Sequence, residues 1–154
     1  MQSVMFVCVG NICRSPCLEA IMKSLIKQKG LEKKIFADSC AISSYHVGCK
    51  ADARMRHCSQ LKGITIDHTA KLFDPVFLDA FDYIFAVDEE VKEFLLSYAT
   101  DKNAHKIFLV TAFSQKYHLE EMPDPYYGGD RGFEHVLDMA GECCHTILKK
   151  IQEP

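Results

Sequence analysis

The sequence predicts an α/β fold: a single domain in which a four-stranded parallel sheet is covered by helices on both faces. Short apolar runs alternate along the chain with longer segments whose apolar residues recur every three or four positions, as in buried strands and amphipathic helices. The chain has 154 residues, of which 48% are hydrophobic and 25% charged, the size and balance of one domain with its own core. We therefore expect one domain over residues 1–154, with no linker or internal repeat.

The first half of the chain contains two predicted strands and two predicted helices. Residues 4–7 are an apolar run that ends at a glycine-containing turn, which predicts a buried strand. A Ser-Pro pair follows at residues 15–16, and because proline suits the first turn of a helix, the periodic apolar residues before Gly30 predict a helix. A second strand is expected over residues 35–38, and a polar helix over about residues 51–62.

The second half continues the alternation. Asp74 and Pro75 open a short predicted helix. Residues 83–87 are the best candidate for a central strand, because all five are apolar or aromatic. Residues 89–98 are then predicted to be helical, and residues 106–110 form the last expected strand.

A long loop and a strongly periodic helix complete the chain. Residues 111–130 contain Pro123, Pro125, Gly128 and Gly129, and surface loops of this length often carry function. Beyond it, apolar residues at helical spacing predict one face packed on the sheet. They are Phe133, Val136, Leu137, Ala140, Cys143, Cys144, Ile147, Leu148 and Ile151.

Composition excludes several classes of function. The net charge is −3 and the isoelectric point is near 6.1, so no broad basic surface for nucleic acid or acidic lipid is expected. The first three residues lack the basic start of a secretory leader, so the eight cysteines favour a reducing, cytoplasmic setting over a disulfide scaffold. No apolar stretch approaches the roughly 20 residues that span a bilayer, and membrane insertion is not expected.

One loop carries a pattern suited to anion chemistry. It joins the first predicted strand to the first helix, and loops at the carboxyl ends of parallel strands are where ligands bind in such folds. Its N–H groups and the helix N-terminus can surround an oxyanion, and an arginine adds a planar fork that matches two phosphate oxygens. The expected phosphate-binding residues are Val9, Gly10, Asn11, Ile12, Cys13, Arg14 and Ser15.

The same positive field favours the thiolate of Cys8, which is the nucleophilic form of cysteine. Taken alone, a cysteine at the end of an apolar strand is more often a small core residue, and Gly10 indicates only a tight turn or a close approach. The neighbouring arginine, asparagine and serine are poorly explained by core packing, however. They favour a catalytic Cys8 assisted by a hydrogen bond from Ser15.

Residues 7–16, Val-Cys-Val-Gly-Asn-Ile-Cys-Arg-Ser-Pro, resemble the signature of the low-molecular-weight protein tyrosine phosphatases, in which five residues separate the cysteine and the arginine. The similarity extends over nearly the whole chain. The further matching segments are residues 38–39, 47–48, 63–64, 67–71, 81–84 and 124–128.

The resemblance implies a doubly wound, flavodoxin-like fold and a metal-independent phosphatase without a cofactor. Its substrates would be phosphotyrosine proteins or small aryl phosphate monoesters, hydrolysed through a cysteinyl-phosphate at Cys8, with inhibition by phosphate and vanadate. Asp124 would be the general acid in the first step and the base toward water in the second. Read alone, this Asp-Pro pair is ordinary turn chemistry, although the flanking prolines would help to aim the carboxyl group.

The resemblance also suggests a substrate pocket. Tyr126 would form one wall of an aromatic slot and Tyr45 the facing wall, so that a phenyl ring stacks between them. Ile12 and Tyr127 are expected beside this slot, and His46 is expected to adjust specificity. Oligomeric state is left open.

Loop support and redox chemistry complete the expectations. Asparagine tolerates a left-handed backbone, and the resemblance names Ser15, Ser39 and His68 as partners of Asn11; alternatively, His68 is an ordinary satisfied polar residue. Cys13 lies close enough to Cys8 in the chain for a reversible disulfide that protects the nucleophile. Cys17 is expected to be a packing residue.

Three alternatives remain. Arsenate reduction uses a similar loop but needs extra cysteines for a disulfide relay, and residues 82–98 contain none. A zinc-binding module is disfavoured because the chain has no CxxC pair, and we predict no metal site. A non-catalytic phosphate-binding module has little support, since both Cys8 and Asp124 are present.

Overall fold

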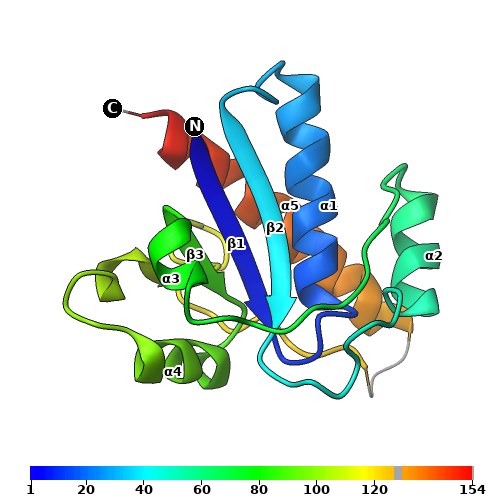
Figure 1. Ribbon diagram of the computed structural model, residues 1–154. Helices are drawn as coiled ribbons and strands as arrows, with labels where there is room; N and C mark the ends of the chain where they lie inside the picture. The colour runs from blue at the N-terminus through cyan, green and yellow to red at the C-terminus, as the bar shows by residue number, and fades with distance from the viewer. Residues whose placement is uncertain (127–129, 154) are drawn as a thin grey trace.

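The computed structural model describes residues 1–126 and 130–153, with an α/β fold (Figure 1). The elements occur in the predicted alternation, and a short 3-10 helix at Ala104–Lys106 precedes the last strand. In chain order the strands and α-helices are β1 (Gln2–Cys8), α1 (Arg14–Gln28), β2 (Ile35–Ala41), α2 (Ala53–Leu61), α3 (Phe77–Ala80), β3 (Tyr83–Ala86), α4 (Glu89–Tyr98), β4 (Ile107–Leu109) and α5 (Asp130–Gln152).

The four strands form one parallel sheet in the order β2-β1-β3-β4, which confirms the predicted sheet. The chain builds the sheet outward from β1, first to β2 on one side and then to β3 and β4 on the other. The order therefore reverses between β1 and β3. In open α/β sheets, ligands bind at the carboxyl ends of the strands at such a switch point, and the loop after Cys8 begins there.

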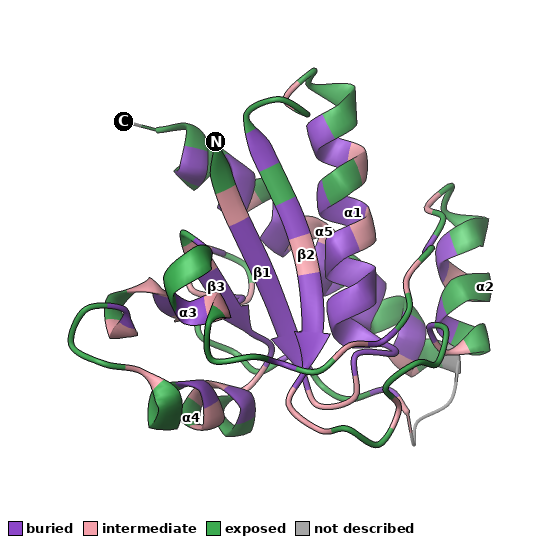
Figure 2. Cartoon of the chain, in the orientation of Figure 1, coloured by how far each residue is buried: buried purple, intermediate pink, exposed green. Residues whose placement is uncertain are grey.

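Helices cover both faces of the sheet. α1 packs against α5 on one face, and α4 lies against β3 and β4 on the other (Figure 1). The inner strand β1 is consequently enclosed on both sides, and Val4, Met5, Phe6 and Val7 have no exposed surface (Figure 2). This explains why residues 4–7 are continuously apolar rather than alternating.

The apolar face predicted for the last helix is confirmed. All nine positions, from Phe133 to Ile151, are buried, and the helix contacts α1 and α2. No helix in the part of the chain that the structure describes is both long enough and apolar enough to cross a membrane.

Most element boundaries differ from the predicted ones by one to three residues, and two of the differences have a clear physical reason. β2 continues three residues past Asp38 because every residue from Ile35 to Ala41 pairs with β1, with Cys8 opposite Ala41. The polar helix α2 starts at Ala53 rather than residue 51, because the Asp52 side chain accepts from the Arg54 N–H and caps it. The extension of β2 brings Ser39 to the end of the sheet where the loop after β1 lies.

Candidate active site

Cys8 is the last residue of β1, and its side chain is almost completely buried beneath the loop that follows. The Asn11 N–H donates to Cys8 Sγ at 3.2 Å, and Ser15 Oγ lies 2.9 Å from the same sulfur. α1 begins at Arg14, so its N-terminal end faces this loop. Two hydrogen-bonding groups and a helix N-terminus therefore surround the sulfur.

Asn11 holds the loop in shape. Its φ of 58° lies in the left-handed region, as expected for this residue type. Its amide nitrogen donates to Ser15 Oγ at 2.7 Å and Ser39 Oγ at 3.0 Å. Its amide oxygen accepts from the Lys71 N–H at 3.0 Å and lies 2.6 Å from His68 Nε2. The structure thus brings together the three partners that the resemblance named.

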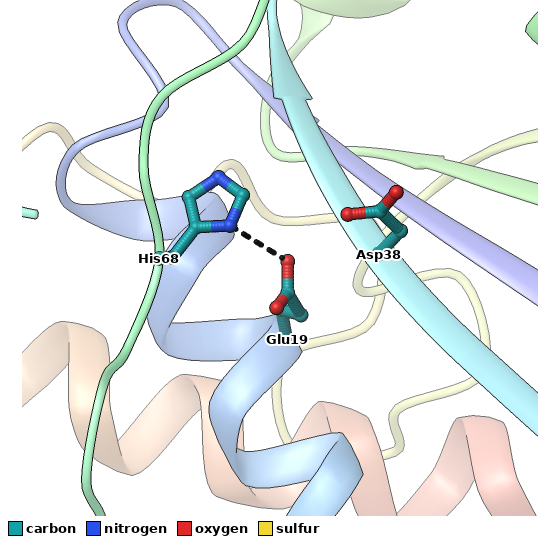
Figure 3. Close-up of side chains that lie close together, drawn as sticks. All are labelled: Glu19, Asp38 and His68. Atoms are coloured by element: carbon teal, nitrogen blue, oxygen red, sulfur yellow. Dashed lines mark ion pairs between the residues drawn. The ribbon is translucent and has the colours of Figure 1, made fainter. Parts of the chain in front are cut away.

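A second layer of charged groups lies behind these partners, and sequence reasoning missed its central member, Glu19. This buried carboxylate lies 3.3 Å from His68 Nδ1 (Figure 3). It also accepts from Ser39 Oγ at 2.7 Å and pairs with Lys23. The sequence did contain a sign of this role, because Glu19 is a charged residue next to Leu18 on the otherwise apolar face of α1.

Glu19, Asp38 and His68 come close enough to resemble a metal site, with one ligand atom of each within 4.8 Å of the others (Figure 3). Their contacts support a different interpretation. The Lys71 ammonium pairs with Asp38, and His68 Nε2 is engaged by Asn11. The cluster is therefore a charge-balanced network beneath the anion loop. Burial lowers the pKa of His68, while the Glu19 carboxylate opposes that shift.

Arg14 is buried and oriented by acceptors from two distant segments. Its Nη1 donates to Asp88 Oδ2 at 2.7 Å and to the Met122 carbonyl at 2.9 Å. Asp88 follows β3 and also caps α4 by accepting from the Val91 N–H. Sequence reasoning did not assign Asp88 to the site. The signal for it was an acidic residue directly after the central strand, at the edge where ligands bind.

Asp124 reaches the loop from the long segment after β4. The Met122 N–H donates to the Val87 carbonyl and fixes the start of this segment at the sheet edge. Asp124 Oδ1 accepts from the Tyr126 N–H at 3.0 Å, and its Oδ2 lies 3.8 Å from Arg14 Nη2. With 45% of its side chain exposed, Asp124 stands at the mouth of the site.

A cavity of about 460 Å³ opens between the loop and these residues. The structure places Tyr45 at its outer rim, 85% exposed. The His46 ring lies between the two tyrosines, with centroids 4.7 Å from Tyr45 and 5.9 Å from Tyr126. His46 and Tyr126 therefore form the inner aromatic walls. The lining residues are Val9, Gly10, Ile12, Cys13, Ser43, Tyr45, His46, Asp124 and Tyr126.

Gly10 is explained by the His46 ring. A Cβ atom at Gly10 would lie 3.0 Å from His46 Cδ2, which is tighter than most real Cβ contacts, so this glycine permits a close approach. Tyr127, the remaining predicted pocket residue, lies outside the described residues.

The cysteines divide by environment. All eight are free thiols. Cys13 is buried next to the nucleophile position, and burial raises its pKa well above the ordinary value. Cys17 is fully enclosed in the core, where burial raises its pKa to about 12. Cys17 thus occupies a packing position.

A parallel α/β sheet with a thiol under an anion loop, a fixed arginine and a carboxyl group at the mouth is the arrangement of cysteine-dependent phosphoric monoester hydrolases. The family model described as low molecular weight phosphotyrosine protein phosphatase matches residues 3–154. The chain belongs to this family. Its members are metal-independent hydrolases that work through a cysteinyl-phosphate.

Individual relatives agree along their whole length. A putative low molecular weight protein-tyrosine-phosphatase of Synechocystis, slr0328, is 40% identical over 151 residues, which are 97% of this chain and 96% of the relative. YfkJ of Bacillus subtilis is also 40% identical, covering 99% and 97%. Its crystal structure has a TM-score of 0.92, with 99% and 95% covered. A protein tyrosine phosphatase structure from Entamoeba histolytica has a TM-score of 0.95 at 38% identity, with 99% and 97% covered.

These matches confirm the predicted family and fold class. They favour phosphatase chemistry over the arsenate-reductase and zinc-module alternatives.

Proposed function

We propose that this protein hydrolyses phosphotyrosine and small aryl phosphate monoesters with Cys8 as the nucleophile. One observation carries the proposal: Cys8 Sγ lies at the floor of the loop, within hydrogen-bonding distance of the Asn11 N–H and the Ser15 hydroxyl. A cysteine that served only for packing would not need these polar neighbours. The family match supports the same assignment.

In the first step, N–H groups of residues 9–15 and the Arg14 guanidinium hold the three terminal phosphate oxygens. The Cys8 sulfur attacks phosphorus, so a P–S bond forms while the P–O bond to the phenol breaks. Asp124 gives its proton to the departing oxygen, which leaves as neutral phenol. The positive charge of the loop and Arg14 stabilises the equatorial oxygens in the transition state.

In the second step, water attacks the cysteinyl-phosphate. Asp124, now a carboxylate, takes a proton from this water, while the P–S bond breaks and inorganic phosphate forms. Cys8 leaves as a thiolate, which Ser15 stabilises at 2.9 Å. No step needs a metal ion, because Arg14 and the N–H groups supply the positive charge. The same loop is expected to bind phosphate and vanadate as inhibitors.

The pocket suits an aryl group. Ile12 offers an apolar surface at its base, and His46 and Tyr126 offer ring faces against which a phenyl group can stack. Tyr45, at the rim, is placed to contact the peptide around a phosphotyrosine. Tyr127 is proposed as a further pocket residue on the basis of the resemblance.

We also propose redox control and a cytoplasmic location. Peroxide would oxidise the Cys8 thiolate to a sulfenic acid. The Cys13 thiol would then attack that sulfur, forming a disulfide and releasing water. Eight free thiols, six of them buried, support a reducing compartment.

The decisive experiment is steady-state hydrolysis of p-nitrophenyl phosphate, with a chelator present, by wild type and Cys8→Ser. The variant is expected to lose about 10⁴-fold or more in kcat, because the hydroxyl is a far poorer nucleophile. Phosphate binding, measured by calorimetry, should persist. The matched control is Cys49→Ser, since Cys49 is exposed and its replacement should leave kcat unchanged. Substantial turnover by Cys8→Ser would overturn the nucleophile assignment.

A further inference from the structure

Arg54 connects the helix α2 to the loop that carries Asp124. It does so by contacting Tyr126, which lies 72 residues further along the sequence. Its Nη2 donates to the Tyr126 carbonyl at 3.1 Å. Its guanidinium carbon lies 5.4 Å from the ring centroid of Tyr126 and 4.8 Å from that of Phe133. A planar guanidinium can stack and donate at the same time, which an ammonium group cannot. These contacts give Arg54 a defined position although its side chain is 46% exposed.

The guanidinium is held in place by Asp52. Arg54 Nε donates to Asp52 Oδ1 at 3.2 Å, and Nη2 donates to Oδ2 at 3.0 Å. Burial alone would raise the pKa of Asp52, but the hydrogen bonds from Arg54 lower it below the ordinary value. Asp52 therefore remains a carboxylate and keeps the fork in one orientation.

Asp52 is in turn fixed to the anion loop, because its N–H donates to the Ile12 carbonyl at 2.7 Å. A continuous chain of contacts thus runs from Ile12 through Asp52 and Arg54 to the backbone of Tyr126. It joins the loop that surrounds Cys8 to the loop that carries Asp124.

Tyr126 links this series of contacts to Asp124. The Tyr126 N–H donates to Asp124 Oδ1 at 3.0 Å, while its carbonyl accepts from Arg54. The Asp124 side chain is nearly half exposed and lies 3.8 Å from Arg14, so packing does little to fix it. The direction of its carboxyl group depends on the backbone that Arg54 holds.

We propose that Arg54 is a positioning residue, which sets the distance and direction of the Asp124 carboxyl group over the anion loop. The proposal rests on the proposed function, in which Asp124 protonates the departing phenol. Loss of Arg54 should therefore reduce the acid-dependent part of catalysis. Phosphate binding and the attack by Cys8 should be retained.

The test compares wild type with Arg54→Lys, which keeps the charge but cannot bond Asp52 and Tyr126 as a fork. For phenyl phosphate, whose leaving group needs the proton, kcat/KM, which covers the steps up to departure of the phenol, is expected to fall about tenfold or more, because a small misplacement of a catalytic group is costly. For 2,4-dinitrophenyl phosphate the loss should be slight. Inhibition by inorganic phosphate should be unchanged. Arg56→Lys is the matched control, since Arg56 bonds only the Ala51 carbonyl of its own segment among the described contacts.

A double-mutant cycle separates positioning from general stability. In an Asp124→Asn background, Arg54→Lys should add little further loss, because the group that it positions has been replaced. Equal losses for both leaving groups, or losses that multiply fully in the double variant, would overturn the proposal.

Amide hydrogen exchange provides a readout that is independent of turnover. Arg54→Lys is expected to speed exchange in the peptide that contains Asp124 and Tyr126 while leaving α5 unchanged. Unchanged exchange in that peptide would overturn the proposal. If wild type failed to hydrolyse any aryl phosphate, the proposed function would fail, and the exchange result alone would decide the role of Arg54.

Discussion

Asn11 shows how a single residue supports the anion loop, because both polar atoms of its side-chain amide have partners. Asn11 uses its amide nitrogen for Ser15 and Ser39, and its amide oxygen for Lys71 and His68. Such a buried amide is costly to replace, because removing it leaves several partners unsatisfied. The hydrogen bonds of this amide also offset the strain of the left-handed backbone at Asn11. The shape of the loop is therefore supported by the hydrogen bonds of Asn11.

Cys13 is predicted to make inactivation by peroxide reversible. Wild type inactivated by a short exposure to hydrogen peroxide should recover activity when dithiothreitol is added, because the Cys8–Cys13 disulfide is reducible. Cys13→Ser has no thiol next to Cys8, so Cys8 should oxidise further to the sulfinic acid and recovery should be largely lost. The measurement is the fraction of p-nitrophenyl phosphatase activity recovered. Full recovery in Cys13→Ser would contradict the proposed role of Cys13, and Cys49→Ser provides the control.

At the scale of elements, the site is built where strands end and helices begin. β1 ends in Cys8 and α1 begins at Arg14, while Asp88 follows β3 and caps α4. Parallel strands bring these ends to one edge of the sheet. The chemistry is thus carried by loops, and rigid elements on both sides determine where each loop starts.

α5 should contribute stability without taking part in catalysis. Ile147 is fully buried on its apolar face, and Ile147→Ala should lower the free energy of unfolding by about 2–5 kcal/mol, from lost burial and the cavity left behind. Urea denaturation measures the change. Lys149→Ala, at an exposed position of the same helix, should alter stability by less than about 0.5 kcal/mol. A large loss of kcat in folded Ile147→Ala enzyme would indicate that α5 does more than pack.

At the scale of the whole molecule, the two charged residues that are buried in the described part of the chain, Arg14 and Glu19, both form ion pairs next to the anion loop. Arg14 pairs with Asp88, and the network behind the loop contains Glu19 and His68, each paired in turn with neighbouring charges. Breaking one partner of a buried pair leaves an uncompensated charge. The stability of the fold and the shape of the site therefore depend on the same ionisations.

His68 makes this dependence testable. Its pKa in the folded protein is lowered from 6.5 by burial, with Glu19 and Asp38 opposing the shift and Lys71 and Lys23 adding to it. The unfolded chain then binds more protons, so the His68 contribution to stability is present above pH 6.5 and is lost as the pH falls below it. Urea denaturation from pH 7.5 to 5.5 should show a shallower decline for His68→Gln than for wild type. An equal or steeper decline would contradict this assignment, and His105→Gln at an exposed position is the control.

The sequence by itself determined the alternation of elements, the buried faces of β1 and α5, and the loop from Cys8 to Ser15. These features are local: burial repeats with the period of each element, and the loop residues are neighbours in the chain. Even the polar helix α2 was located to within two residues.

Only the tertiary structure decided which distant groups meet. Asp88 contacts Arg14 across 74 residues, and Arg54 contacts Tyr126 across 72 residues. No periodicity records such pairs, because they form only when the parallel strands align and bring their carboxyl ends to one edge. The position of His46 between Tyr45 and Tyr126 was decided in the same way, by side-chain packing over Gly10.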